Sequence, residues 1–415
     1  MRDMYLQTLL PQPVRQALLQ DIQGHLLQDV LGFWTPRACD VEHGGYHTHF
    51  DRQGRLLSNE KNTWLHARQT WLFARVYQDL VSDPSWLALA RQGRDWLVGH
   101  AYAGGGRWNY LLNAEGRVQQ GTIALYTDLF VLMALCAYLQ ASGRQQDLPL
   151  VEATFQAAAQ NLCNDQFPDL FPQQYQPGRI SHGKYMIALN AFACAAPVLG
   201  WNRCKPLIAY CLDRIFGVLA DPVRPTVYEL RTLQGGGVDT EEGHRLNPGH
   251  IFESMWFVLA LPPQMVSPDQ RDLALRIVRA TADQSLDRRY GGVVHMLDDE
   301  GHEGRYVDWD PNRALKWDEK VWWTHAEVLC ALLIHADQTG SKASLGDFEA
   351  LYTWCKRHFW DEEYGEWYAV LHRDGKPRIM DKGGLQKSAF HVPRALYNCC
   401  LLLQGKPIFG KGGEV

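Results

Sequence analysis

A repeating alternation of two patterns constrains the fold of this chain more than any other feature of its sequence. Segments with apolar residues at i, i+3 and i+4, the period of a helix packed on one face, come in pairs. Gly-rich segments separate the pairs and carry short alternating apolar runs that end in a turn such as Glu-Gly or Asp-Gly, the signal of a β-hairpin. The clearest hairpin segments are residues 42–54, 104–116, 290–301 and 364–375, with weaker copies near 167–180 and 230–243.

About twelve segments have the helical period, and they form six pairs that recur roughly every 60–75 residues. Six helical pairs can close into a double ring whose inner helices present residues to a central cleft. We therefore expect an all-α fold, an (α/α)6 barrel of about twelve helices with short β-hairpins in the loops. The predicted helices cover residues 14–33, 64–77, 86–98, 127–140, 150–163, 186–199, 206–219, 251–261, 270–285, 321–336, 345–359 and 388–403.

The domain organisation follows from the same pattern. No Pro-, Gly- or Ser-rich linker divides the chain, so we expect a single barrel domain over residues 1–415. A TIM barrel would alternate single strands with helices, whereas the strands predicted here come in hairpins.

Composition and charge narrow the classes of partner. The net charge is −5 and the charges are interspersed, so no basic stripe suggests nucleic acid, and no apolar run is long enough to cross a membrane. The ten Cys include no CxxC pair, and the adjacent Cys399 and Cys400 are poorly placed for a disulfide, which favours reduced thiols. The first residues lack the apolar core of a signal peptide. We expect a cytoplasmic protein. Its 15 Trp suggest an aromatic core and, in part, a site that stacks on sugars.

Two distant segments place a histidine among apolar residues with a charged residue three positions on. They are His250 with Glu253, and His391 with Arg394, each at the start of a predicted helix. A neutral imidazole in a partly dry site is the usual protein base near neutral pH. The alternative is that each is a structural histidine satisfied by a neighbour, which is the commoner role of a single buried histidine.

Two more helices carry polar residues beside tryptophan. Arg68 lies one turn after Trp64 on the same helix face, and Glu327 lies one turn after Trp323. A tryptophan beside a carboxylate suits a sugar, with the ring face on the indole and the hydroxyls on the carboxylate. An internal salt bridge for Arg68 and a packed Trp323 with a surface Glu327 are the structural alternatives.

The sequence gives little support to a metal or a nucleotide fold. His47 and His49 alternate on one strand face, but no third ligand is placed by the sequence, so we expect no metal. The Gly-rich segments 104–106 and 235–237 lack the context of a Walker A or Rossmann motif.

At these residues the chain resembles the N-acylglucosamine 2-epimerase family over about residues 33–400. Taken singly the matching motifs are weak, but in this order they are specific. They are Gly44-Gly45-Tyr46, Trp64-Leu65-x-x-Arg68-Gln69, Asn247-Pro248-Gly249-His250-x-x-Glu253-x-Met255-Trp256, Trp317-Asp318-x-Lys320-x-Trp322-Trp323, Tyr364-Gly365-Glu366-Trp367 and Phe390-His391-Val392-Pro393-Arg394-Ala395.

The resemblance implies an (α/α)6 barrel, His250 and His391 as the acid/base pair, and Arg68, Glu253 and Glu327 lining the site. Our candidate catalytic residues are His250 and His391. Our candidate substrate-binding residues are Arg68, Glu253, Glu327, Trp64, Trp323 and Arg394. Met186 stands near the position where cellobiose 2-epimerases carry a histidine, which disfavours that activity. The resemblance also implies ATP as a possible activator and a possible homodimer, although the loop at residues 383–387 is poor in Gly and Lys for a nucleotide.

The sequence thus predicts a sugar epimerase that interconverts N-acyl-D-glucosamine and N-acyl-D-mannosamine by moving a proton at C2 of the ring-opened sugar, with no required cofactor. An aldose–ketose isomerase of the mannose/fructose type could use the same residues. A glycoside hydrolase would instead use two carboxylates, for which Glu253 and Glu327 are candidates. A non-catalytic sugar-binding protein would keep the tryptophans without needing both histidines.

Overall fold

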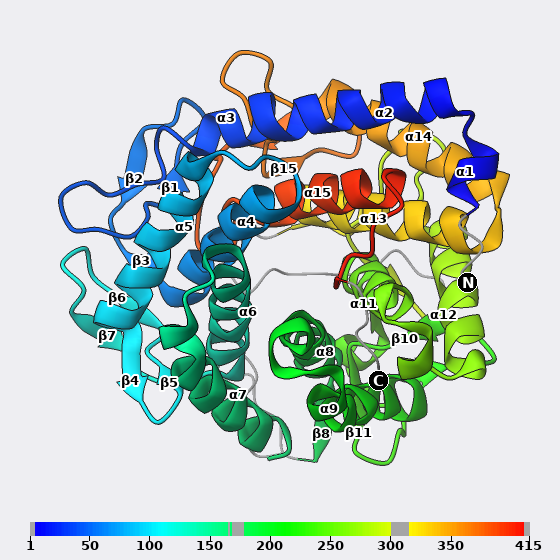
Figure 1. Cartoon of the computed structure of the whole chain (residues 1–415). Coiled ribbons are helices and arrows are strands. Elements are labelled where there is room, and N and C mark those ends of the chain that lie inside the picture. Colours follow the sequence, from blue (N-terminus) through cyan, green and yellow to red (C-terminus); the bar gives the residue numbers. More distant parts are fainter. Residues whose placement is uncertain (1–4, 165–166, 168–177, 300–314, 411–415) are drawn as a thin grey trace.

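The computed structural model describes residues 5–164, 167, 178–299 and 315–410. Over this part of the chain, twelve helices of at least seven residues form two concentric rings, so the predicted (α/α)6 barrel is confirmed. The chain runs once around the ring, from the blue N-terminal helices through green to the red α15 (Figure 1).

Six helices form the inner ring, and each contacts the next until the last returns to the first. They are α4 (Thr63–Asp79), α6 (Leu125–Ser142), α8 (His182–Leu199), α11 (Pro248–Ala260), α13 (Trp322–Thr339) and α15 (His391–Leu403). The outer helices are α2 (Gln12–Gly24), α5 (Pro84–Trp96), α7 (Leu148–Leu162), α9 (Trp201–Arg214), α12 (Pro268–Ser285) and α14 (Lys342–His358).

Burial explains which helices lie inside. In the inner helix α6, 14 of 18 residues are buried, and they surround the helix on all sides. Its length and composition would also suit a membrane span, and α6 is the one described helix of which this is true. The outer helix α9 buries Trp201, Cys204, Ile208, Cys211 and Leu212, which form a single stripe at helical spacing.

Shorter elements complete the fold. Three π-helical turns, His25–Val30, Leu97–Ala101 and Ile215–Leu219, extend α2, α5 and α9. Short helices are α1 (Leu6–Leu9), α3 (Leu31–Trp34), α10 (Glu241–His244) and the 3-10 turns Gln145–Asp147 and Pro263–Met265. The strands are β1 (His49–Phe50), β2 (Leu56–Ser58), β3 (Lys61–Asn62), β4 (Tyr102–Gly104), β5 (Arg107–Trp108), β6 (Leu111–Leu112), β7 (Val118–Gln120), β8 (Arg179–Ser181), β9 (Ala220–Asp221), β10 (Thr226–Val227), β11 (Leu230–Thr232), β12 (Arg245–Leu246), β13 (Leu297–Asp298), β14 (Lys320–Val321), β15 (Val370–Leu371) and β16 (Pro377–Ile379).

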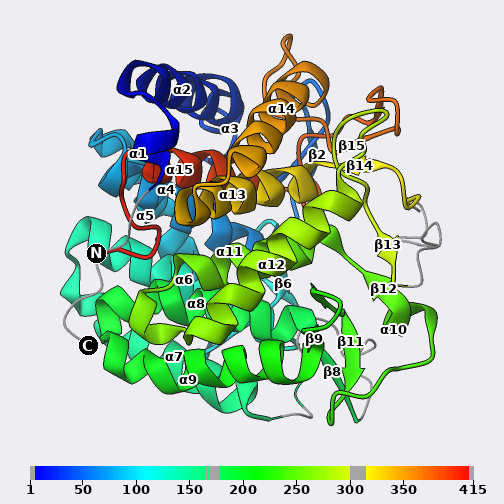
Figure 2. The ribbon, with the colours of Figure 1, turned by 90° about the vertical axis from the view of Figure 1, so that its right-hand side faces the viewer.

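Most labelled strands gather at one mouth of the barrel, with α1 at the opposite mouth (Figure 2). Segment 42–54 contains β1, but its hairpin partner β2 follows the segment. Segment 104–116 contains parts of two hairpins, and segment 364–375 contains β15 and the turn towards β16. Two expectations were wrong in their partners. β13 pairs with β12 rather than within 290–301, and β11 pairs with β8 across the loops. Strands of two or three residues pair with whichever backbone the packed helices bring beside them. Most of segment 167–180 lies outside the described residues, as do residues 300 and 301.

Three buried Asp–Lys ion pairs fasten these loops to the inner helices, a repeat that the sequence analysis did not recognise. In each, the aspartate begins a Gly-containing turn whose ends form an isolated β-bridge. The lysine lies before the start of an inner helix, two residues before α4 or α13 or nine residues before α15, and has no exposed surface. The pairs are Asp40–Lys61 at 2.7 Å, Asp287–Lys320 at 3.0 Å and Asp361–Lys382 at 3.1 Å.

The first pair gives a testable pH dependence. Burial alone would raise the pKa of Asp40, but the hydrogen bond from Lys61 and backbone N–H donors outweigh it and lower this pKa to about 2. The unfolded value is about 3.9, so the stabilisation is present above about pH 4 and is lost as the pH falls towards 2. We expect Lys61→Met to lower the free energy of unfolding by about 3 kcal/mol near neutral pH, because it leaves a buried carboxylate uncompensated.

Urea unfolding between about pH 5 and 3 checks this, since the wild-type advantage should shrink as Asp40 is protonated. A deficit that stays constant over this range would contradict the assignment. Lys376→Met is the matched control, because its ion pair with Asp374 is exposed, at 79% and 42% of the two side chains, and should matter little.

Candidate active site

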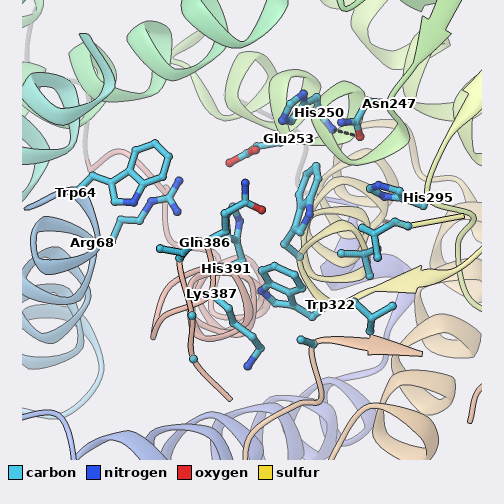
Figure 3. A pocket seen from close by; sticks show the side chains of 18 of the residues that line it. Trp64, Arg68, Asn247, His250, Glu253, His295, Trp322, Gln386, Lys387 and His391 are labelled. Carbon is cyan, nitrogen blue, oxygen red and sulfur yellow. Dashed lines mark hydrogen bonds between the residues drawn. The ribbon is translucent and has the colours of Figure 1, made fainter. Parts of the chain in front are cut away.

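A cavity of about 620 Å³ opens at the strand-bearing mouth, and all six inner helices contribute to its lining. The helical lining residues come from the first two turns of these helices, so the positive N-terminal ends of the six helices face the cavity. Figure 3 shows labelled side chains of α4, α11, α13 and α15 around this space. The helical lining residues are Trp64 and Arg68, Tyr126, Gly183, Met186 and Ile187, His250 and Glu253, Trp322 and Trp323, and His391.

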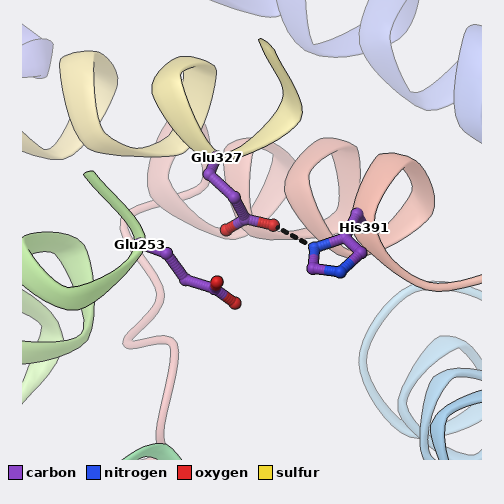
Figure 4. A group of neighbouring side chains, drawn as sticks. All are labelled: Glu253, Glu327 and His391. Carbon is purple, nitrogen blue, oxygen red and sulfur yellow. Dashed lines mark hydrogen bonds and ion pairs between the residues drawn. The ribbon is translucent and has the colours of Figure 1, made fainter. Parts of the chain in front are cut away.

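His391 is the first residue of α15 and is 9% exposed. Its Nδ1 lies 2.7 Å from Oε1 of Glu327 (Figure 4). A neutral imidazole that donates from Nδ1 to this carboxylate keeps Nε2 free as an acceptor. Trp256 Nε1 donates to the other oxygen of Glu327 at 2.8 Å, which fixes the carboxylate and therefore the imidazole.

His250 is the third residue of α11 and repeats this arrangement with another carboxylate. Its Nδ1 lies 2.8 Å from Oε2 of Glu229, a residue that the sequence analysis missed. Both imidazole rings pack against Trp323, with ring centroids 5.1 Å from His250 and 5.7 Å from His391. Gly249 permits this, because a Cβ there would lie 2.4 Å from the Trp323 ring. The two histidines predicted from sequence therefore share one indole.

The two imidazoles are biased towards opposite protonation states. Burial and the nearby Arg68 hold the pKa of His391 well below its usual value of about 6.5. Burial would also lower the pKa of His250, but the charge and hydrogen bond of Glu229 outweigh it and raise this pKa. Near neutral pH, His391 is thus a neutral base and His250 is the better proton donor.

This bias predicts a bell-shaped dependence of kcat/KM on pH for the direction in which His391 takes the proton. Activity should fall on the acid side well below about pH 6.5, where His391 is protonated, and on the alkaline side above about pH 6.5, where His250 loses its proton. Glu229→Gln should move only the alkaline limb to lower pH, because it removes the charge that raises the pKa of His250. Initial rates from about pH 5 to 10 test this, and an unmoved alkaline limb would contradict it.

Arg68 is the third reactive group of the cavity. Its guanidinium lies over the rings of Trp64, Phe130 and Phe390, with 4.1 Å to the Phe130 centroid, and it has no carboxylate partner among the described residues. Burial, together with the charge of Arg394, lowers the pKa of Arg68 to about 9. A buried cation without a counter-ion is well placed to bind an oxyanion that forms in the cavity.

Arg394 lies behind the cavity lining, and so does Glu327. The Nη2 of Arg394 donates to Oε1 of Glu253 and, at 2.7 Å, to Oε1 of Glu327. Of the predicted substrate-binding residues, Glu253, Trp64, Trp323 and Arg68 therefore line the cavity, whereas Arg394 and Glu327 hold the residues that do.

Glu253, Glu327 and His391 offer ligand atoms within 4.8 Å of one another, a spacing that could hold a metal ion. The guanidinium of Arg394 already lies between the two carboxylates and supplies the cation there. The same contacts argue against a glycosidase. The paired carboxylates of retaining or inverting enzymes lie about 5–9.5 Å apart with the sugar bond between them, whereas here one guanidinium nitrogen joins both.

The loop at residues 381–387 forms one wall of the cavity mouth, and it is tightly held. The side chains of Lys382 and Lys387 are buried, and Lys387 Nζ donates to the carbonyl of Lys382 at 2.9 Å. Gly383 packs against Thr48, whose carbonyl oxygen would lie 1.9 Å from an added Cβ. These contacts favour a tight connection over a mobile lid.

A barrel whose inner helices bring two carboxylate-bound imidazoles and a buried arginine into one cavity has the parts of an enzyme that moves protons on a sugar. The model of the family described as N-acylglucosamine 2-epimerase (GlcNAc 2-epimerase) matches residues 44–395. The chain belongs to this family, and it is a carbohydrate epimerase or isomerase.

Individual relatives span several activities. The chain is 27% identical to N-acylglucosamine 2-epimerase of Homo sapiens, over 91% of this chain and 88% of the relative. It is 22% identical to mannose-6-phosphate isomerase of Rhizobium meliloti, over 91% and 95%. The solved structure of cellobiose 2-epimerase from Spirochaeta thermophila has the same fold, with a TM-score of 0.80 at 18% identity over 95% of this chain and 98% of that one.

Proposed function

We propose that this enzyme interconverts N-acyl-D-glucosamine and N-acyl-D-mannosamine. The observation that carries the proposal is the pair of imidazoles, His391 and His250, which pack against one indole and are biased towards opposite protonation states. Inversion at a carbon requires one group to remove a proton and another to return it on the opposite face. A neutral base and a protonated acid in one cavity meet that requirement.

The chemistry starts from the open-chain sugar, because the hydrogen on C2 is acidic only when C1 is a carbonyl. His391 Nε2 removes this proton, and the electron pair moves into the C1–C2 bond and onto the carbonyl oxygen. Arg68 and the helix N-termini stabilise the resulting enolate oxygen. His250 then protonates C2 on the other face. The reverse reaction exchanges the roles, and no oxidation state changes, so no redox cofactor is needed.

The N-acyl substrate is supported by the α8 side of the cavity. Met186 and Ile187 give this wall an apolar surface that suits the methyl group of an acetamido substituent. The 27% identity to a vertebrate N-acylglucosamine 2-epimerase over most of both chains points to the same substrate class. The cavity volume of about 620 Å³ accommodates an open-chain amino sugar.

Incubation with N-acetylglucosamine, mannose or cellobiose in separate reactions, followed by NMR of the products, tests the proposal. We expect the 2-epimer of N-acetylglucosamine to form faster than any product of the other two sugars. If only mannose reacts and the product is fructose, the substrate assignment is wrong.

An aldose–ketose isomerase is the second candidate, favoured by the similarity to mannose-6-phosphate isomerase of Rhizobium meliloti. It would deliver the proton to C1 of a cis-enediol instead of C2. A ketose product that carries the transferred hydrogen at C1, instead of an aldose inverted at C2, would show that the enzyme is an aldose–ketose isomerase.

A further inference from the structure

The two carboxylates that orient the histidines are themselves held in different ways. Glu327 has both oxygens occupied, one by Trp256 and the other by Arg394 and His391. Glu229 binds His250 through Oε2, but its Oε1 is buried and makes no hydrogen bond with the described residues. Something else must keep Glu229 from rotating away from His250.

The group nearest to that oxygen is His182. It is the first residue of α8, and its side chain has no exposed surface. Its Nδ1 lies 3.5 Å from Oε1 of Glu229, and its ring meets the ring of His250 edge-on at 6.3 Å between centroids.

The backbone fixes this neighbourhood. The amide of His182 donates to the carbonyl of Glu229 at 3.0 Å, and Ser181 in β8 pairs with Leu230 in β11. The pairing of β8 with β11 thus places the side chains of His182 and Glu229, which are 47 positions apart in the chain, beside each other. Neither ring nitrogen of His182 has a hydrogen-bond partner among the described residues, so the ring is available to Glu229.

We propose that His182 is a positioning residue that acts on His250 through Glu229. It takes the place that Trp256 and Arg394 have at the other carboxylate. A small rotation of Glu229 brings Oε1 within hydrogen-bond distance of Nδ1 while Oε2 keeps its bond to His250. In this His182–Glu229–His250 row, His182 keeps the Glu229 carboxylate in contact with His250, the acid of the reaction. The inference rests on the proposed role of His250.

The surrounding charges define what His182 should control. His250 faces Glu229 beside β11, Glu253 on its own helix and Glu327 on α13. His295 is also buried near His250, and its pKa is lowered by burial and by the charges of His250 and of Arg245 in β12. Among these, Glu229 alone hydrogen bonds to His250 through its side chain. Loss of its positioning therefore weakens the contact that keeps His250 protonated.

Two substitutions separate positioning from packing. His182→Leu removes the donor and should lower kcat by about tenfold with a small change in KM, and shift the alkaline limb of kcat/KM to lower pH. His182→Gln keeps a donor and should retain most of both properties. Equal impairment of the two variants, or an unmoved alkaline limb in a folded Leu variant, would overturn the proposal.

A double-mutant cycle tests the route of action. If His182 acts through Glu229, adding His182→Leu to Glu229→Gln costs no further activity, so the effects are strongly non-additive. Additive losses would show that His182 works independently of Glu229, and the proposal would fail. His335→Leu is a matched control, since this buried histidine on α13 bonds to Ser344 and does not line the cavity.

A measurement without turnover keeps the inference separate from the proposed function. NMR titration of ¹⁵N-labelled histidine should give a lower pKa for His250 in the His182→Leu and Glu229→Gln variants than in the wild type, whereas His182→Gln should leave it nearly unchanged. If His250→Asn retains full activity, the proposed function fails. If His250→Asn is inactive while the titration and the cycle show no effect of His182, only the positioning inference fails.

Discussion

Replacing His391 by Asn should lower turnover by about 10²- to 10⁴-fold, the usual contribution of a positioned acid or base. Asn can keep a hydrogen bond to Glu327 but has no ring nitrogen to take the C2 proton. The pKa of His391 lies well below 6.5, so the wild-type residue is the neutral base of the resting enzyme. Steady-state rates with N-acetylglucosamine, together with circular dichroism for folding, provide the measurement.

The control for this substitution is His335→Asn, which also changes a buried histidine but one bonded to Ser344 away from the cavity. It should leave turnover nearly unchanged. A folded His391→Asn enzyme that keeps near-wild-type turnover would remove His391 from the mechanism.

The second large effect is on stability. Arg394→Met should lower the free energy of unfolding by about 3–5 kcal/mol, because it leaves the carboxylates of Glu253 and Glu327 buried together without their cation. Both carboxylates bond to one nitrogen of Arg394, which is 1% exposed. Activity should also fall, because Glu327 orients His391. Urea unfolding at neutral pH measures the change.

Arg276→Met is the matched control, because the Arg276 and Asp272 side chains are 47% and 68% exposed. It should change the unfolding free energy by less than about 1 kcal/mol. An Arg394→Met protein as stable as the wild type would show that the two carboxylates are neutralised in another way, for example by binding protons.

The sequence predicted most helices well, because outer helices such as α9 bury one stripe at helical spacing and inner helices such as α6 are long apolar segments. Starts and ends were less predictable. α8 begins at His182, four residues before the predicted start, because His182-Gly183-Lys184-Tyr185 is polar yet fully buried. Lys184 reaches the carbonyl of Asn164 at 3.0 Å, a contact that no local pattern announces.

The candidate site was predictable where its residues lie close together on one helix. His250 with Glu253, and His391 with Arg394, have the spacing of one helix face and lie at helix starts. Glu229 and His182 were missed because their relation to His250 depends on the pairing of β8 with β11, strands too short to show a pattern. The ion pairs of Arg394 could not be predicted, because its carboxylate partners lie on two other helices, Glu253 on α11 and Glu327 on α13.

The most direct test of two bases on one carbon is a short incubation of N-acetylglucosamine in D₂O, stopped after a small fraction has reacted. The N-acetylmannosamine formed should carry solvent deuterium at C2, because His391 removes the original hydrogen and His250 delivers a different one from the opposite face. The recovered N-acetylglucosamine should still carry hydrogen at C2. Product that retains its original hydrogen at C2, or substrate that gains deuterium as fast as product forms, would contradict the two-histidine account.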